Sequence, residues 1–347
     1  MKPSSFTQPG YRVTEDADLT HHNSFRVPAR AQWLIEVDDA RALPEVFGLG
    51  AVKRSPLLIL GEGSNVLLTR DWPGVVLAVA ARGIRVLEDR GDDARMRVEA
   101  GENWNEFVHW SLGHGFAGLE NLILSPGSVG AAPIQNIGAY GVEVREFIET
   151  VEAFDRGAGC SVRLDNADCA FAYRDSLFKR EADRFVVTAA ELLLPRRREL
   201  RLDYAGVREE LAAMRIAAPN HAAVADAVMR LRTRKLPNPA EIGNAGSFFK
   251  NPVVPSALAN ELRRENPALP AWLGNAGQCK LSAAWLVEAC GFKGLREGDA
   301  GVSERHALVL VNHGTATGEQ IRALAQRVVD TVQTRFGIRL EPEPRIV

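Results

Sequence analysis

Ser247 stands in the segment GNAGSFFKNP (243–252), among small residues and directly before two phenylalanines and a lysine. The serine nucleophile of many hydrolases lies in a G-x-S-x-G turn that follows an apolar strand. Here Phe249 occupies the position of the second glycine, and no apolar strand leads into the turn. If Ser247 is catalytic, it therefore acts in some way other than as the nucleophile of a hydrolase elbow.

A first glycine loop lies in LLILGEGSNVLLT (57–69), where Gly61 and Gly63 directly follow an apolar strand. Val66 stands where the Rossmann fingerprint has its third glycine, and a strand instead of a helix follows, which disfavours that fold. Small residues between two strands can still direct backbone N–H groups at a pyrophosphate. A plain tight turn is the alternative.

A second loop, SPGSVGAAPIQNIGAYG (125–141), is rich in glycine and other small residues. Such a run buries little apolar surface of its own, so ordering it without a ligand costs conformational entropy. A large flat ligand lying against the backbone would explain the composition. An ordered Ω-loop without a ligand is the alternative.

Composition excludes several classes of protein. The 42 basic and 44 acidic residues give a net charge of -2, so no field of one sign favours nucleic acid or an anionic membrane. No apolar run approaches the roughly 20 residues of a membrane span, and the first residues lack a secretory signal, which favours the cytoplasm. The four cysteines form no CxxC pair and indicate buried thiols in a reducing compartment; no metal is expected, because the seven histidines lack ligand spacing.

The helices and strands that must position these loops are predicted from the periodicity of apolar residues. Short strands are predicted first, then helices, with a break at the stiff segment LPNP (236–239), so the fold class is α+β. A helix over 103–115 should begin at an Asn cap, and Asp38 or Asp39 should cap a short helix that reaches about Leu49. The predicted strands are 32–37, 56–60, 66–69, 75–80, 83–89, 94–101, 147–155, 184–194 and 338–347, and the later helices are 204–215, 221–236, 255–265, 281–290 and 317–336.

Six segments occur together in a characteristic order: GEGSN, PGSVGAAPIQNIGAYG, AYRDSLFK, RTRKLP, NAGSFFKNP and LEPEPR. In this order and approximate spacing they resemble the UDP-N-acetylenolpyruvoylglucosamine reductases, the MurB family of peptidoglycan synthesis, from about Asn23 to the C-terminus. The resemblance implies an FAD-binding fold of the vanillyl-alcohol oxidase (PCMH) type in two subdomains, 1–82 and 83–236, the second joined by a C-terminal strand over 337–347. A third α+β domain over 237–336 would bind the substrate.

The implied reaction is reduction of the enolpyruvyl ether of UDP-N-acetylglucosamine to UDP-N-acetylmuramate, with NADPH as the reductant. Neither glycine loop contains histidine, so FAD is expected to be noncovalent. The resemblance assigns GEGSN to the FAD pyrophosphate and the second loop to the rest of the cofactor. The expected cofactor residues are Gly61, Gly63, Ser64, Asn65, Pro126, Gly127, Ser128, Val129, Gly130, Gln135, Asn136, Gly138, Ala139, Tyr140, Gly141 and Arg232.

Three residues match the family's catalytic positions. Arg174 would hold the carboxylate of the enolpyruvyl group while negative charge develops on the adjacent carbon. A guanidinium suits this role because it binds carboxylates bidentately and keeps its charge. Ser247 matches the proton donor, with Lys250 as a possible local cation. Glu343 matches the catalytic glutamate, although Glu341 would share its face of a strand and alternation cannot choose between them. An exposed edge strand with prolines is the alternative reading of that segment.

Matches to substrate positions complete the expected site. They are Tyr173, Tyr204, Lys235 and Asn251, with Lys235 suited to the diphosphate. Trp272 stands, on a gapless count, where type I members carry a tyrosine that covers the substrate, and tryptophan cannot supply a phenol. His306 stands where some members carry glutamine, and a buried histidine is equally plausible there.

Two other functions stay open at this point. One is an FAD-linked oxidase of the same superfamily, and the other is a noncatalytic nucleotide-sugar binding protein. Retention of Arg174, Ser247 and Glu343 disfavours the second, since binding alone needs no proton donor. We expect a monomer with small-molecule ligands, and no nucleic-acid or membrane partner.

Overall fold

The computed structural model describes residues 4–182, 184–274 and 277–347. The chain forms two compact units, which are described separately. Unit 1 consists of Met1–Ala17, Arg30–Gly63 and Trp72–Thr233, and unit 2 consists of Asp18–Ala29, Ser64–Asp71 and Arg234–Val347. The boundary after Thr233 falls within the last turn of helix α6 (His221–Lys235), shortly before the predicted break at 236–239.

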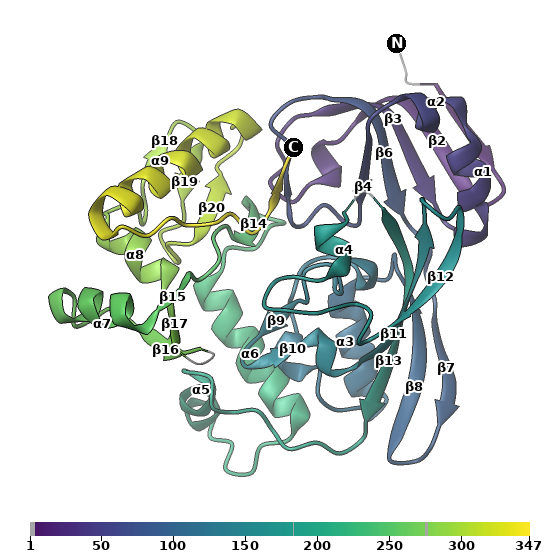
Figure 1. Ribbon diagram of the computed structural model, residues 1–347. Helices are drawn as coiled ribbons and strands as arrows, with labels where there is room; N and C mark the ends of the chain where they lie inside the picture. The colour runs from purple at the N-terminus through teal and green to yellow at the C-terminus, as the bar shows by residue number, and fades with distance from the viewer. Residues whose placement is uncertain (1–3, 183, 275–276) are drawn as a thin grey trace. The chain divides into compact units, whose positions relative to one another are not determined.

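The first sheet of unit 1 has the strand order β1-β2-β3-β6-β4 (Figure 1). β3 and β4 both run parallel to β6, and the short helices α1 and α2 lie in the connection between β3 and β4. Asp39 caps the 3-10 turn before α1, as predicted. The bounds are β1 (Ser5–Gln8), β2 (Tyr11–Asp18), β3 (Arg30–Val37), β4 (Leu57–Leu60), β6 (Trp72–Val79), α1 (Leu43–Gly48) and α2 (Gly50–Arg54).

The second sheet of unit 1 is antiparallel, with the order β12-β11-β13-β8-β7. Its apolar face packs with α3 and α6 in one core, in which Met96 and Val98 of β8 join Trp104 of α3 and Val228 of α6. The bounds are β7 (Ile84–Asp89), β8 (Asp93–Glu99), β11 (Ile148–Asp155), β12 (Cys160–Asp165), β13 (Phe185–Pro195), α3 (Trp104–Gly113), α4 (Leu177–Arg180) and α5 (Val207–Ala213), with the small strands β9 (Gly138–Ala139) and β10 (Val142–Glu143).

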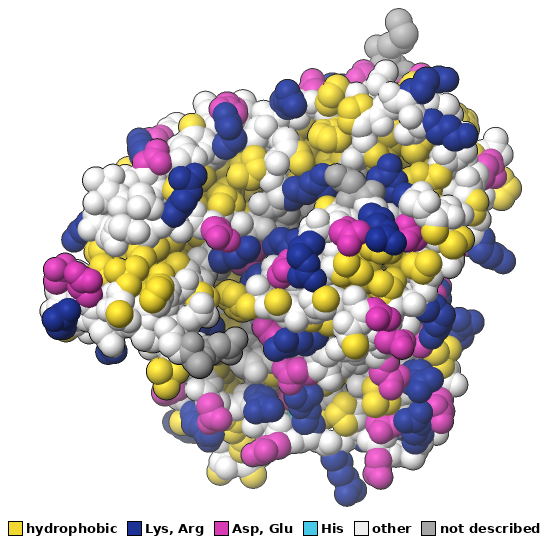
Figure 2. Space-filling view, viewed as in Figure 1, with side chains coloured by type: hydrophobic (Ala, Val, Ile, Leu, Met, Phe, Trp, Pro, Cys, Tyr) yellow, Lys and Arg dark blue, Asp and Glu magenta, His cyan; other side chains and the backbone are white. Residues whose placement is uncertain are grey.

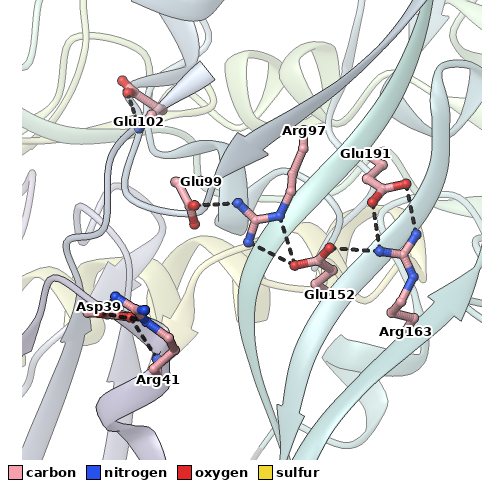
Figure 3. Close-up of polar contacts among 9 residues, drawn as sticks. Asp39, Arg41, Arg97, Glu99, Glu102, Glu152, Arg163 and Glu191 are labelled. Atoms are coloured by element: carbon pink, nitrogen blue, oxygen red, sulfur yellow. Dashed lines mark hydrogen bonds and ion pairs between the residues drawn. The ribbon is translucent and has the colours of Figure 1, made fainter. Parts of the chain in front are cut away.

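Alternate residues of this second sheet carry a network of ion pairs (Figure 3). Arg97 of β8 donates to Glu152 of β11 at 2.8 Å and also pairs with Glu99. Arg163 of β12 bridges Glu152, at 2.8 Å, and the buried Glu191 of β13, at 2.7 Å. Both guanidinium groups pair with carboxylates, so the ion pairs link the strands β8, β11, β13 and β12.

Unit 2 contains a sheet in the order β14-β20-β19-β18 and a smaller one in the order β15-β17-β16. Helix α9 begins in a capping box of Thr317 and Gln320 and ends at Gly337, whose φ of 68° suits glycine. The bounds are β14 (Gly243–Ser247), β15 (Val253–Pro255), β16 (Ala271–Leu273), β17 (Gln278–Leu281), β18 (Arg296–Glu297), β19 (Ala300–Val302), β20 (Val309–Asn312), α7 (Ser256–Glu265), α8 (Ala283–Ala289) and α9 (Gly318–Phe336). The 3-10 helices of the two units are η1 (Thr20–His22), η2 (Ala40–Ala42), η3 (Glu120–Leu122), η4 (Val129–Ala131) and η5 (Val144–Glu146).

The C-terminal segment differs from its prediction. A strand forms only at β21 (Arg345–Ile346), which runs parallel to β5 (Val66–Leu67). Pro342 and Pro344 have no N–H group, so a continuous ladder over 338–347 cannot form. This segment pairs within unit 2 and does not extend the sheet over 83–236, to which the sequence analysis had joined it.

The prediction of four buried thiols is wrong for Cys160, which is exposed, and Cys290 is only partly buried. Cys169 is buried, and burial raises the pKa of its thiol to about 12. Strands β1, β2 and β12 were not predicted, because their many polar residues hide the apolar alternation.

Surface charge follows the balance of the composition. Figure 2 shows Lys and Arg interspersed with Asp and Glu over the face that it presents. Among the described residues, no helix is both long and apolar enough to cross a membrane.

Candidate functional site

The two predicted glycine loops meet in unit 1. A Cβ atom added at Gly61 would lie 2.6 Å from Oγ of Ser128, so the serine side chain would have to move to admit one. Asn103 caps α3 by accepting from the N–H of Glu106 and also donates to Oε1 of Glu62 at 2.9 Å. Gly61 and Glu62 thus meet the PGSVG segment beside the N-terminus of α3, where helix N–H groups favour an anion.

Part of the second loop is anchored by its own backbone. The N–H of Val129 donates to the carbonyl of Glu102 at 2.8 Å, and that of Gly130 donates to Ala100 at 2.9 Å. A Cβ at Gly130 would come within 2.4 Å of the Ala100 Cβ atom. Val129 and Gly130 were expected to bind the cofactor, and their two N–H groups are occupied by the protein.

Asn136 connects the same loop to the segment that carries Arg174. Its side chain is fully buried, donating to Glu143 at 3.1 Å and to the Ala172 carbonyl at 3.0 Å and accepting from the N–H of Arg145. Both amide hydrogens are used in this way, so the side chain of Asn136 positions the loop and has no hydrogen left for a ligand.

Arg174 is held in a left-handed conformation, with a φ of 53°. Its Nη2 atom donates to the carbonyl of Gly138 at 2.5 Å, and its guanidinium lies 5.4 Å from the ring centre of Tyr173. Buried Ser176 fixes the neighbouring chain by donating to the carbonyl of Ile134 at 2.6 Å. Left-handed non-glycine residues cost energy and cluster at functional sites.

A group of aromatic and basic side chains lies at the end of the second loop. The rings of Tyr140 and Tyr204 are 4.9 Å apart, and Tyr204 is 51% exposed. Arg232 of α6 donates to the carbonyl of Leu124 at 3.1 Å. Burial lowers the pKa of Arg232, and nearby Arg174 lowers it further, against the opposing effect of the two tyrosines.

In unit 2, Ser247 ends β14 opposite Val309 of β20. The register shifts between Asn244 and Ser247, and Gly246 has a φ of 68°, so a bulge re-aims the chain directly before the serine. Phe248 and Phe249 behind it are buried in edge-to-face contact at 5.1 Å.

Glu343 lies on the segment that runs beside Ser247. Its N–H donates to the carbonyl of Phe248 at 2.8 Å, and its own carbonyl accepts from Nδ2 of Asn65 at 3.4 Å. Glu341 instead pairs with Lys250 at 3.3 Å and is mostly exposed. Glu341 and Lys250 therefore form an ion pair on this segment.

Lys235 and His306, both expected at the substrate, interact in unit 2. Burial lowers the pKa of His306, and the positive charges of Lys235 and Lys293 lower it further. Nδ1 of His306 accepts from the N–H of Leu308 at 3.3 Å, which places the proton of the neutral ring on Nε2.

Two other expected substrate residues lie near the small sheet of unit 2, in which β15 and β16 both pair with β17. Oδ1 of Asn251 accepts from the N–H of Ala283 at 3.0 Å and so caps α8. Trp272 of β16 is 48% exposed, with Nζ of Lys280 at 5.9 Å from its ring centre. Of the three residues expected to be catalytic, unit 1 holds Arg174, and unit 2 holds Ser247 and Glu343.

Sequence reasoning overlooked two asparagines that support the second loop. Oδ1 of Asn105 accepts from the N–H of Leu124 at 2.8 Å, and Nδ2 of Asn121 donates to the carbonyl of Tyr140 at 2.9 Å. Asn121, shortly before the glycine-rich loop, was the available signal, since an asparagine amide can satisfy irregular backbone, whereas Asn105 lies in α3 and gave none.

The fold and the two loops define a flavin-binding protein of α+β class. The family model described as an FAD binding domain matches residues 31–165, and the one described as the C-terminal domain of UDP-N-acetylenolpyruvoylglucosamine reductase matches residues 238–347. The structure of the reductase MurB from Thermus caldophilus resembles the chain with a TM-score of 0.66 at 24% identity, covering 100% of this chain and 99% of that one.

Two relatives that match nearly the full length of the chain identify its family within the flavin-binding proteins. It is 52% identical to the UDP-N-acetylenolpyruvoylglucosamine reductase of Xanthomonas axonopodis pv. citri (strain 306), with 99% of each chain covered. It is 49% identical to the same enzyme of Xylella fastidiosa (strain M12), over 98% of this chain and 97% of that one. The chain belongs to the UDP-N-acetylenolpyruvoylglucosamine reductase family.

The residues present fit an FAD cofactor. The glycines of the two loops leave backbone uncovered by side chains. In addition, the Nε atom of Arg232 is buried and has no hydrogen-bond partner in the described part of the chain. A buried donor that the protein leaves unsatisfied suits a ligand rich in oxygen atoms.

Proposed function

We infer that this chain reduces the enolpyruvyl ether of UDP-N-acetylglucosamine to UDP-N-acetylmuramate in peptidoglycan synthesis. FAD, when bound, takes reducing equivalents from NADPH and passes them to the substrate double bond. The chain itself binds the substrate, stabilises the developing charge and supplies a proton.

Charge stabilisation falls to Arg174 and Glu343. Reduction at the methylene carbon leaves negative charge on the neighbouring carbon and its carboxylate, which the guanidinium of Arg174 can hold in bidentate contact. Its hydrogen bond to Gly138 orients this side chain before substrate arrives. Glu343 is proposed to hold the reacting group in place beside Ser247.

Ser247 is proposed to donate the proton. The observation that carries this role is the pairing of its strand with the Glu343 segment, through the 2.8 Å bond between the Glu343 N–H and the Phe248 carbonyl. Because Lys250 already pairs with Glu341, relief of the serine alkoxide is assigned to water. Buried Phe248 and Phe249 support the serine from within the unit.

The UDP-sugar is proposed to contact Tyr173, Tyr204, Lys235, Asn251, Trp272 and His306. Lys235 is exposed and can reach a diphosphate, and its positive charge helps to keep neighbouring His306 neutral. A neutral imidazole with its proton on Nε2 can donate to a phosphate or sugar oxygen.

We further propose that the enzyme works as a cytoplasmic monomer, with the three-domain division 1–82, 83–236 and 237–336. Four free cysteines suit a reducing compartment. Light scattering of the purified protein tests the oligomeric state.

Colour tests the function most directly. The purified protein should be yellow, lose its colour under NADPH without oxygen, and regain it on adding the enolpyruvyl substrate. A colourless protein that FAD cannot reconstitute contradicts the proposal. Reoxidation by oxygen but not by substrate would favour the oxidase alternative.

The Ser247→Ala variant tests the proton donor. NADPH should still bleach the flavin, while reoxidation by substrate slows by roughly 10²- to 10⁴-fold, the usual contribution of a general acid. Ser161→Ala, on an exposed position of β12, is the matched control and should behave as the parent. Equal losses in both half-reactions would assign Ser247 to structure.

A further inference from the structure

The segment that presents Arg174 contains two left-handed residues other than glycine. The N–H of Asp175 donates to the carbonyl of Ala172 at 3.2 Å, and the N–H of Ala172 donates to the carbonyl of Asp175 at 3.0 Å. Tyr173 and Arg174 therefore form a two-residue turn, in which Arg174 has a φ of 53°, and Ala170 before the turn has a φ of 46°. Glycine or asparagine is usual at such positions, because other residues are strained there. Contacts from outside the segment must hold it in this conformation.

Arg180, the last residue of α4, contacts this segment at two points. Its Nη2 atom donates to the carbonyl of Ala170 at 3.1 Å, and its Nη1 atom pairs with a carboxylate oxygen of Asp175. One contact thus lies before the Arg174 turn and the other at its last residue. Because a guanidinium group is planar and rigid, the two contacts fix the distance between these points. Arg180 therefore clamps the segment on both sides of Arg174.

Helix α4 connects this clamp to the second glycine loop. Ser176 caps α4 and donates to the carbonyl of Ile134 at 2.6 Å, while Nη2 of Arg174 donates to the carbonyl of Gly138 at 2.5 Å. Both carbonyl groups belong to that loop. The loop thus holds the start of α4 and the guanidinium of Arg174, and Arg180, at the end of α4, holds the backbone between them.

We propose that Arg180 is a positioning residue, which keeps the guanidinium of Arg174 in place for the carboxylate of the enolpyruvyl group. The proposal rests on the proposed function, because it takes Arg174 as the group that stabilises the developing charge. Without the clamp, the turn can relax from its left-handed conformation, and the guanidinium of Arg174 moves with it. A misplacement of about 1 Å can lower the rate of a catalysed step by roughly 10²-fold.

The test compares Arg180→Met with Arg184→Met in the full-length protein loaded with FAD. The two arginine side chains are 44% and 49% exposed, but Arg184 pairs with Asp155 of β11 and not with the Arg174 turn. An exposed ion pair contributes about 1 kcal/mol or less to the free energy of unfolding, so Arg180→Met should fold, which circular dichroism checks. Reduction of FAD by NADPH and its reoxidation by the enolpyruvyl substrate are measured separately.

We expect Arg180→Met to slow reoxidation by roughly 10- to 100-fold and to leave reduction by NADPH unchanged. Arg184→Met should change neither rate. Adding Arg180→Met to Arg174→Met should slow reoxidation no further, because a positioning residue acts only through the group that it positions. Arg180→Lys keeps the charge without the planar donor set, so it should recover part of the lost rate.

Asp175→Asn tests the same clamp from its other end. The variant removes the charge of the carboxylate, so it should slow reoxidation in the same direction, and it replaces Arg180→Met if that variant does not fold. Folded variants at both positions with parental reoxidation would overturn the proposal. So would a further loss of rate when Arg180→Met is added to Arg174→Met, since that loss would not pass through Arg174. The proposed function fails separately, in the parent protein, if FAD does not bind or if the enolpyruvyl substrate does not reoxidise it.

Discussion

Arginines of unit 1 lie in two opposite settings. On the second sheet, Arg97 and Arg163 each face carboxylates, and the hydrogen bonds with Glu152 and Glu99 raise the pKa of Arg97 although burial would lower it. Near the cofactor loop, Arg232 faces two tyrosines and another arginine, and burial lowers its pKa. The same kind of side chain is fully paired in one place, while in the other its Nε atom has no hydrogen-bond partner in the described part of the chain.

This difference indicates how a charged residue that stabilises the fold can be distinguished from one that binds a ligand, namely by its hydrogen-bond partners. Paired charges satisfy one another and leave less hydrogen-bonding capacity for a ligand. Unpaired buried donors weaken the fold unless something binds them, which is the cost that functional sites commonly carry.

The largest contrast should appear in catalysis. Arg174→Met should lower kcat/KM by roughly 10²- to 10³-fold, since it removes the group that stabilises developing charge. Arg163→Met should leave kcat/KM of the folded enzyme unchanged, because its partners are structural. Steady-state assays with NADPH and the enolpyruvyl substrate measure kcat/KM for both variants. An equal decrease in the two would contradict the distinction between a catalytic and a structural arginine.

A smaller contrast should appear in stability, within the network itself. Arg163→Met leaves the buried carboxylate of Glu191 without its partner and should cost about 1–3 kcal/mol of unfolding free energy. Glu191→Gln keeps a hydrogen-bonding side chain, and the exposed Arg163 can turn to water, so it should cost less. Urea unfolding of the two variants ranks them, and the reverse order would contradict the argument.

The smallest effect concerns pH and another paired arginine. Hydrogen bonds from Arg184 hold the pKa of Asp155 at about 2, well below its ordinary value. A lowered carboxyl pKa in the folded state stabilises the protein above the unfolded-state pKa, and this stabilisation is lost as the pH falls through the folded value. The stability advantage over Asp155→Asn should thus be full at neutral pH and vanish near pH 2. Unfolding curves measured from pH 7 to pH 2 check this, and an advantage that grew on acidification would refute the pairing.

The sequence by itself determined the local features of the protein. Asn103 and Thr317 mark two helix starts, and Gly337 marks a helix end, because caps depend on neighbouring residues only. The glycine loops and the six motifs pointed to the family for the same reason, being contiguous segments whose residue types can be recognised without a fold.

Only the tertiary structure decided which groups satisfy one another. It paired Lys250 with Glu341, 91 residues apart, and left Glu343 beside the Ser247 strand. It also joined the C-terminal strand to β5 and buried the Nε atom of Arg232. Each outcome depends on contacts between distant segments, and neither periodicity nor composition specifies which distant partner a charge or strand will meet.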